Sequence, residues 1–170
     1  MDSEQIDYED LTSMRLDDES LRALVEPGGE CIFNWTTTDG YPVGVVVAYV
    51  YRDSKFWTTC AARRKRVPAL RKRPQSGIVI NRNGKTASYK GDSIVHANGD
   101  AGFEELKTWF YATLAGVATA PEDEYRRSFA KFLDSPHRVI IETDARLVVA
   151  FDTARFAKFT NEAIAKGQGG

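Results

Sequence analysis

The sequence is poor in the residues that build metal centres and disulfide frameworks. It has two cysteines, Cys31 and Cys60, and two histidines in 170 residues. The cysteines form no CxxC motif and have no pair of histidines nearby, which excludes the usual zinc and disulfide patterns. We therefore predict no metal site, and we expect both cysteines to be buried free thiols in a reducing compartment.

Long apolar runs are also missing. No segment approaches the roughly 20 apolar residues that a membrane-spanning helix needs, and the first residues are acidic, unlike the basic start of a signal peptide. We expect a cytoplasmic protein with no membrane partner. The composition, 42% hydrophobic and 28% charged, is that of a globular protein. We predict a single domain over residues 17–160, preceded by an acidic N-terminal segment, residues 1–16, and followed by a flexible C-terminal tail, residues 161–170.

The net charge of −1 gives the molecule no overall field that would select a partner. The charges are nevertheless unevenly placed. Residues 1–30 hold ten acidic and two basic side chains, whereas residues 63–73 hold seven basic side chains and no acidic one. A basic cluster of this density should attract an anion, although a solvated basic face without a ligand is the simpler alternative. Aromatic residues are not interleaved with these bases, so we expect no nucleic-acid partner.

Short apolar segments between turn residues predict a mainly β fold. Asp39-Gly40 and Asn83-Gly84 are typical of hairpin turns. Helical spacing predicts a short helix after Asp17 or Asp18, helices over residues 102–115 and 121–133, and a C-terminal helix. We expect strands at residues 31–37, 42–51, 56–60, 76–81, 86–90, 93–97, 138–142 and 147–151. Regularly spaced strands interrupted by one helical pair indicate a β-barrel with peripheral helices.

The basic cluster directly follows the predicted strand 56–60. A junction between a strand end and a helix start presents free backbone N–H groups to a phosphate. The hydroxyls of Thr58 and Thr59 would add donors, and arginine carries the planar fork that matches phosphate oxygens. This junction is therefore the candidate anion site, and we expect a short helix to follow it and to end at Pro74.

The order of the motifs resembles a known family. In chain order they are Thr37-Thr38-Asp39-Gly40-Tyr41-Pro42, an apolar strand, Trp57-Thr58-Thr59, Arg64-Lys65-Arg66, Leu70, Arg71-Lys72-Arg73-Pro74 and the strand Gly77-Ile78-Val79-Ile80. Over about residues 20–155 the chain resembles the flavin/deazaflavin oxidoreductases, which have a pyridoxamine 5′-phosphate oxidase-like, FMN-binding-like split β-barrel. Its helical insert is more similar to the actinobacterial branch that uses coenzyme F-420. The resemblance implies a homodimer with the cofactor at the interface between two barrels.

By this resemblance, Arg64, Lys65 and Arg66 match the basic positions that hold the cofactor phosphate, and Thr59 matches a small hydroxyl position. The family commonly has lysine at the position of Arg66, so the charge is kept. The strand that carries residues 45–47 borders the isoalloxazine ring in relatives. The predicted cofactor-binding residues are Val45, Val46, Val47, Thr58, Thr59, Arg64, Lys65, Arg66 and Arg71, and the first candidates for ring stacking are Tyr89 and Trp109.

No acid–base constellation stands out. His96 and His137 are far apart in the sequence, and Asp152 fits a helix cap, so the sequence identifies no candidate catalytic residue. Hydride transfer is the cofactor's own chemistry and needs only well-placed carbons and the exclusion of water. We expect an oxidoreductase that binds coenzyme F-420, or FMN as the alternative, and passes hydride to a small unsaturated or heteroaromatic acceptor. The alternative from another class is a non-catalytic flavin or tetrapyrrole (heme or biliverdin) binding protein of the same fold.

Overall fold

The computed structural model describes residues 12–167. Part of the acidic segment, residues 1–11, and the last three residues lie outside this range. The elements, in chain order, are η1 (Thr12–Met14), α1 (Asp18–Val25), β1 (Gly29–Thr36), β2 (Pro42–Arg52), β3 (Lys55–Ala61), α2 (Arg66–Lys72), β4 (Gln75–Arg82), β5 (Lys85–His96), α3 (Phe103–Leu114), η2 (Val117–Thr119), α4 (Glu124–Leu133), β6 (Arg138–Asp152) and α5 (Thr153–Ala165).

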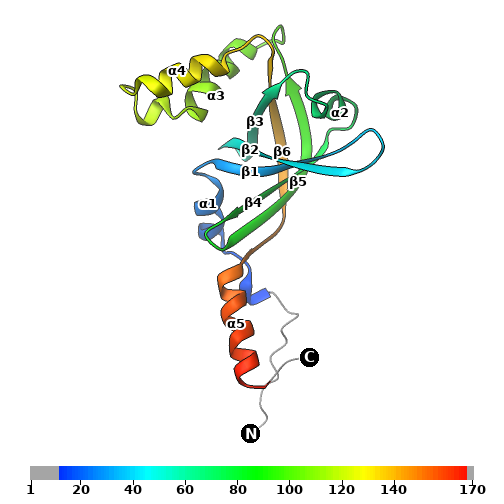
Figure 1. Ribbon diagram of the computed structural model, residues 1–170, viewed down its shortest axis with the longest axis vertical. Coiled ribbons are helices and arrows are strands. Elements are labelled where there is room, and N and C mark those ends of the chain that lie inside the picture. The colour runs from blue at the N-terminus through cyan, green and yellow to red at the C-terminus, as the bar shows by residue number, and fades with distance from the viewer. Residues whose placement is uncertain (1–11, 168–170) are drawn as a thin grey trace.

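The strands form one closed antiparallel barrel in the order β1-β2-β3-β6-β5-β4 (Figure 1). The turns at Asp39-Gly40 and Asn83-Gly84 connect antiparallel neighbours, β1 to β2 and β4 to β5. Helices α3 and α4 lie at one end of the barrel and α5 extends from the other, as Figure 1 shows. The prediction of a mainly β barrel with peripheral helices is confirmed.

Two predicted breaks are wrong, because the chain crosses both of them as continuous strand. The sequence predicted separate strands on either side of Gly91-Asp92 and on either side of residues 143–146. In the structure these segments belong to β5 and β6 and pair with each other, Gly91 with Ala145 and Asp92 with Asp144. A Cβ at position 91 would lie 2.1 Å from the backbone oxygen of Asp144. The glycine therefore permits the close approach of two strands and does not mark a turn.

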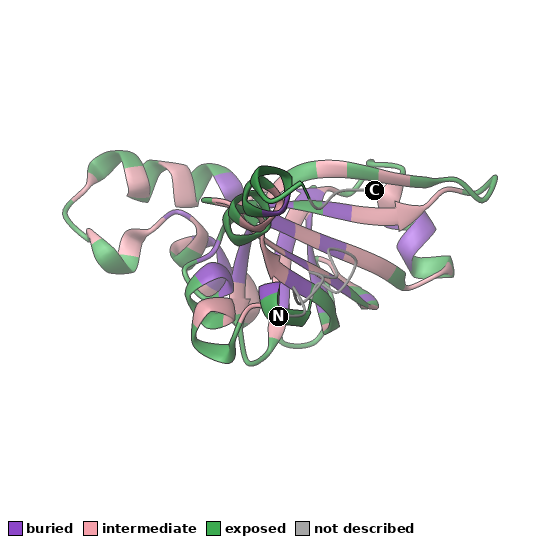
Figure 2. Ribbon diagram, turned by 90° about the horizontal axis from the view of Figure 1, so that it is seen from below, coloured by how far each residue is buried: buried purple, intermediate pink, exposed green. Residues whose placement is uncertain are grey.

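The main core fills the barrel. Buried and more exposed residues alternate along strands of the barrel, as Figure 2 shows. In β3, Phe56, Thr58 and Cys60 are buried while their neighbours are partly exposed. A second apolar cluster lies between helices α3 and α4 and the outer face of the barrel, with Phe110 and Ile140 fully buried. The helical pair thus covers part of the outer face of the barrel.

Several local predictions are confirmed. Cys31 and Cys60 are free and buried, and burial raises the pKa of the Cys31 thiol to about 12. Asp17 caps α1 by accepting a hydrogen bond from the Ser20 N–H (2.7 Å), and Asp152 caps α5 by accepting from the Ala154 N–H (2.9 Å). Helix α5 continues to Ala165, so residues 161–165 of the expected tail are helical.

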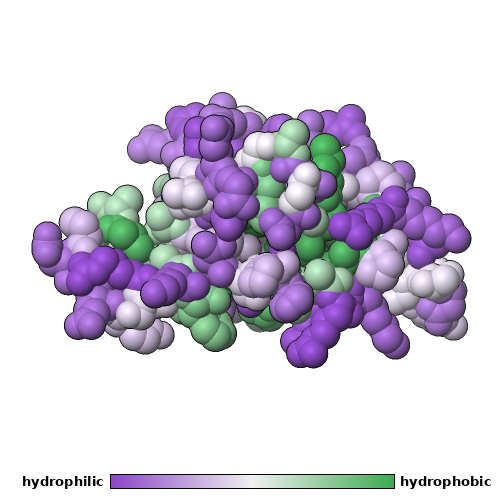
Figure 3. Space-filling model, turned by 90° about the horizontal axis from the view of Figure 1, so that it is seen from above, coloured by the Kyte–Doolittle hydropathy of each residue, from purple (hydrophilic) through white to green (hydrophobic). Residues whose placement is uncertain are grey.

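The face of the molecule shown in Figure 3 is mostly hydrophilic. Figure 3, which views the end of the molecule that carries α2, α3 and α4, shows apolar side chains gathered in patches between polar ones. None of the helices within residues 12–167 combines the length and the apolar character that crossing a membrane requires.

Candidate functional site

The structure gathers most of the predicted site residues around one groove. A cavity of about 770 Å³ lies between the middle of β2, the end of β1 and the loop that connects β3 to α2. Six of the nine predicted binding residues line it, three apolar and three basic: Val45, Val46, Val47, Arg64, Lys65 and Arg66. The groove therefore has an apolar strand along one side and a basic loop along another.

The basic loop is held in place by backbone hydrogen bonds. The Ala62 N–H donates to the His137 carbonyl (2.8 Å), and the Arg64 N–H donates to the Ala61 carbonyl (3.0 Å). Helix α2 then buries Val67 and Leu70 against the barrel core. Because the helix has seven residues, its dipole is small, and the side-chain charges set the potential of the groove.

Carboxylates within residues 12–167 do not neutralise the cations of the groove, and the charge of Lys65 makes only the smallest contribution to the lowered pKa of Asp39. No ion pair involves Arg63, Arg64, Lys65 or Arg66 within residues 12–167. The guanidinium carbon of Arg66 lies 5.9 Å from the centre of the Trp35 ring, which is within cation–π range. Unpaired positive charge beside an aromatic ring and an apolar strand is suited to a ligand with an anionic end and a flat body.

Three predicted residues do not reach the groove. Thr58 is 2% exposed and points into the barrel, because β3 alternates and its neighbours Phe56 and Cys60 also face inward. The hydroxyl of Thr59 donates to the Val139 carbonyl across the β3–β6 pair (2.8 Å). Arg71 is exposed on the last turn of α2 and does not line the groove. The charged hydrogen-bond donors that line the groove are therefore the basic side chains of the loop.

Trp35 and Arg63 line the groove without having been predicted as binding residues. The signal for Trp35 was available in the hairpin, because the Asp39-Gly40 turn fixes the register that places Trp35 opposite Val43 and next to the apolar strand. Arg63 belongs to the same basic cluster as its neighbours. Its side chain is exposed at the start of the loop.

The residues considered for ring stacking lie elsewhere. Tyr89 is 8% exposed inside the barrel, with its ring 4.9 Å from that of Phe56. Trp109 on α3 packs edge-on against Trp57 at 5.5 Å, and the Arg52 guanidinium lies 4.4 Å from its ring centre. Neither side chain lines the groove.

His96 is part of a charged cluster on the outer face of the barrel. Its Nε2 lies 2.7 Å from Oε2 of Glu142, whose other oxygen accepts a hydrogen bond from Lys55. Burial acts to raise the pKa of Glu142, but the hydrogen bonds and charges of Lys55 and His96 outweigh it, so the pKa lies below its ordinary range. His96 also stacks on Trp57 at 6.1 Å. This cluster joins β3, β5 and β6, and none of its members lines the groove.

The groove itself offers binding chemistry and no acid–base pair. Its lining consists of tryptophan, valine, arginine and lysine. Such side chains can hold an anion and a planar ring and can keep water from an apolar surface. Any reaction carried out there would depend on the bound molecule for its reactive atoms.

The sequence matches no protein-family model and no curated protein. Solved structures do match. The conserved hypothetical protein Rv2991 from Mycobacterium tuberculosis has a TM-score of 0.69 at 14% identity, covering 85% of this chain and 89% of its own. An F-420 reductase has a TM-score of 0.53 at 13% identity, with 76% and 94% covered. HutZ, a heme storage protein from Vibrio cholerae, has a TM-score of 0.59 at 10% identity, with 82% and 98% covered.

A pyridoxamine 5′-phosphate oxidase-related, FMN-binding protein from Nostoc punctiforme also matches, with a TM-score of 0.52 at 13% identity over 72% of this chain and 74% of its own. The chain therefore has the pyridoxamine 5′-phosphate oxidase-like split-barrel fold, as the order of its motifs predicted. At these identities the likeness establishes the fold alone. The deazaflavin, flavin and heme named for three of these proteins are ligands of those proteins.

Proposed function

We propose that the groove binds a flavin-type cofactor and that the protein is an oxidoreductase. The observation that carries this proposal is the meeting, around one cavity of about 770 Å³, of four unpaired cations with Trp35 and an apolar strand. Arg64, Lys65 and Arg66 would hold the anionic end. Val45, Val46 and Val47 would lie along the ring, and Trp35 would close one side.

Coenzyme F-420 is the proposed cofactor, with FMN as the alternative. The deazaflavin coenzyme carries a phosphodiester and an acidic glutamate tail, whereas FMN carries a single phosphate. Four cations exceed what one phosphate requires, so the charge of the loop favours the more acidic molecule. The likeness of the fold to an F-420 reductase supports the same choice.

When bound, the reduced cofactor would supply hydride to a small unsaturated or heteroaromatic acceptor. The side chains of the groove would then bind and orient the cofactor and exclude water from its ring. This is sufficient for hydride transfer between well-placed carbons. The lining residues include no acid–base pair, which agrees with a reaction in which the cofactor supplies the hydride and the protein only binds and orients.

We further propose that two copies of the chain meet over the groove. Ile32 and Val46 pair across β1 and β2 on the outer face of the barrel, and they are 41% and 64% exposed. Adjacent exposed apolar side chains beside a half-open cavity are suited to coverage by a second barrel. A homodimer of this kind would enclose the ring of the cofactor between two subunits.

A second candidate function is the storage or transport of a tetrapyrrole or flavin without turnover. The likeness of the fold to the heme storage protein HutZ supports it, as does the lack of a proton donor in the groove. Tight binding of a cofactor whose reduced form is never oxidised, across a broad panel of acceptors, would favour this function over catalysis.

The decisive experiment is a fluorescence titration of the purified protein with F-420, FMN and hemin. We expect the double variant Arg64→Ala/Arg66→Ala to lose at least about tenfold in affinity, since charge-assisted hydrogen bonds contribute about 1.5–3 kcal/mol each. The matched control is Arg71→Ala, which removes an exposed cation of the same cluster outside the groove. Equal losses in both variants would mean that the ligand responds to general charge, and unchanged affinity in the double variant would overturn the proposed site.

A further inference from the structure

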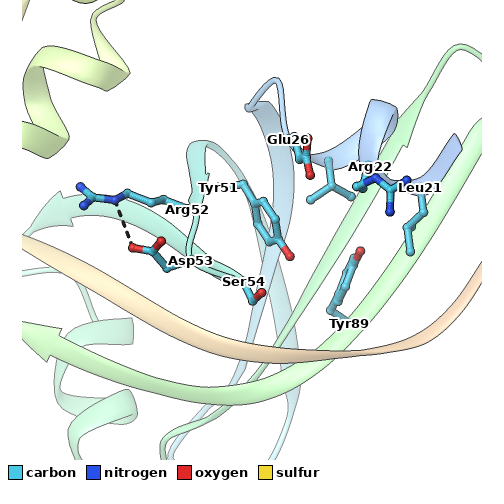
Figure 4. Close-up of a pocket in the computed structure, with 9 residues that line it drawn as sticks. Leu21, Arg22, Glu26, Tyr51, Arg52, Asp53, Ser54 and Tyr89 are labelled. Carbon is cyan, nitrogen blue, oxygen red and sulfur yellow. Dashed lines mark ion pairs between the residues drawn. The ribbon is translucent and has the colours of Figure 1, made fainter. Parts of the chain in front are cut away.

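A second cavity, of about 540 Å³, lies between α1 and the turn that connects β2 to β3. It shares no lining residue with the groove described above. Figure 4 shows the phenol groups of Tyr51 and Tyr89 turned toward this cavity from two different strands. Its volume lies within the range of small-molecule sites, about 300–1,000 Å³.

The two phenols belong to an aromatic cluster around Phe56. The rings of Tyr49, Tyr51 and Tyr89 lie 5.5, 4.9 and 4.9 Å from the Phe56 ring. The Tyr49 hydroxyl donates to the Val25 carbonyl (2.9 Å) and so ties α1 to the barrel. The hydroxyls of Tyr51 and Tyr89 have no hydrogen-bonding partner within residues 12–167.

The Tyr89 side chain is largely buried, but its hydroxyl oxygen is accessible from the cavity, because it is not among the fully buried side-chain atoms that lack a hydrogen-bonding partner. The side chain is 8% exposed. Burial, with a smaller contribution from the neighbouring tyrosines, raises the pKa of Tyr89 to about 12. The group therefore keeps its proton at neutral pH, and its O–H is free to donate to an acceptor that enters the cavity.

One cation at the rim is available to a ligand. Arg22 on α1 lines the cavity and forms no ion pair within residues 12–167, whereas Arg52 is paired with Asp53 at 3.1 Å. Two carboxylates also line the cavity: Glu26, the C-cap of α1, which forms no ion pair within residues 12–167, and Asp53, which is paired with Arg52. The cavity is therefore lined by three hydrogen-bond donors, the two phenols and the Arg22 guanidinium. On the side of α1 its wall is apolar and is formed by Leu21 and Val25.

We propose that this cavity is a binding site for a small aromatic monocarboxylate. The carboxylate would accept hydrogen bonds from the Tyr51 and Tyr89 hydroxyls and pair with Arg22, and the ring would pack against Leu21 and Val25. Glu26 would repel a second negative charge, so the site would discriminate against dicarboxylates. The site does not depend on the cofactor proposed for the groove.

The probe is benzoate, followed by ¹⁵N-resolved NMR of the full-length protein. We expect saturable shifts confined to α1, residues 51–54 and the neighbourhood of Tyr89, with a Kd that titration to about 20 mM can define. Benzamide, which lacks the charge, and isophthalate, which carries a second one, should each bind at least about fivefold more weakly. The absence of saturable shifts, or equal affinity for all three compounds, would overturn the proposal.

The tyrosines supply a matched set of variants. Tyr89→Phe and Tyr51→Phe should each weaken benzoate binding about fivefold to tenfold, because each removes a hydrogen bond to a charged group. Tyr49→Phe should leave the affinity for benzoate unchanged while lowering the denaturation midpoint, because the Tyr49 hydroxyl donates to the Val25 carbonyl and does not line the cavity. Full benzoate affinity in Tyr89→Phe would refute the assignment. Retained binding in Arg64→Ala/Arg66→Ala is expected and separates this site from the groove.

Discussion

Replacing Glu142 by glutamine tests the charged cluster on the outer face of the barrel. The carboxylate is 8% exposed and is hydrogen-bonded by Lys55 and by His96, the latter at 2.7 Å. A hydrogen bond to a charged group contributes about 1.5–3 kcal/mol. The Lys55 side chain is 37% exposed, so solvent screening reduces its share to about 0.5–1 kcal/mol. We expect Glu142→Gln to lower the free energy of unfolding by about 2 kcal/mol at pH 7.

The pH dependence of this loss gives the sharper test. Because the pKa of Glu142 is lower in the folded protein than in the unfolded chain, its stabilising effect is complete above about pH 5 and fades as the pH falls through the folded pKa. The difference between wild type and Glu142→Gln, measured by urea unfolding, should therefore be larger at about pH 5.5 than below about pH 4. The control is Glu105→Gln, an exposed position on α3 without an ion pair within residues 12–167. A difference of the same size at about pH 5.5 and below about pH 4 would refute the reasoning.

The remaining predictions concern the strands and helix ends. Gly91→Ala should cost more than about 3 kcal/mol in urea unfolding, because the new Cβ would lie 2.1 Å from the Asp144 carbonyl and β6 must move away; a loss below about 1 kcal/mol would contradict the close approach. Cys31 should react with a thiol reagent only as the protein unfolds, since burial raises the pKa of its thiol to about 12; rapid labelling of the native protein at this position would contradict that. Asp152→Ala should cost about 1 kcal/mol and reduce the helical circular dichroism signal, whereas asparagine should retain most of the cap. An alanine variant as stable as wild type would show that α5 does not need this cap.

Much of the fold was predictable because local signals agreed with the global arrangement. Asp39-Gly40 and Asn83-Gly84 form the expected hairpins, and Asp17 and Asp152 cap the expected helices. The prediction was wrong at Gly91. Glycine is common in turns, but here it allows close contact with a strand more than fifty positions away in the sequence. Contacts of that kind depend on the register of distant strands, which local pattern does not specify.

The candidate site was predictable to a similar extent. The density of basic residues in the sequence predicted the basic loop, and the family resemblance predicted the apolar strand beside it. The periodicity of β3 already indicates that Thr58 faces inward with Phe56, so this residue could have been removed from the set before the structure was known. Arg71 could not, because the orientation of a seven-residue helix is fixed only by the core that Val67 and Leu70 contact. The cavity between Tyr51 and Tyr89 has no sequence signal, because closure of the barrel alone brings the two strands together.

The position of β6 in the barrel governs when the chain can fold. This strand hydrogen-bonds to β3 on one side and to β5 on the other, so it is the last piece that closes the cylinder. Until residue 152 has left the ribosome, β3 and β5 each present a free edge to solvent or to a neighbouring nascent chain. Closure must also bridge the helical insert that separates β5 from β6, which makes the final pairing a long-range event and a slow one. A truncated product ending before residue 138 would therefore carry two open edges and aggregate, whereas β6 pairs with both of these edges in the structure.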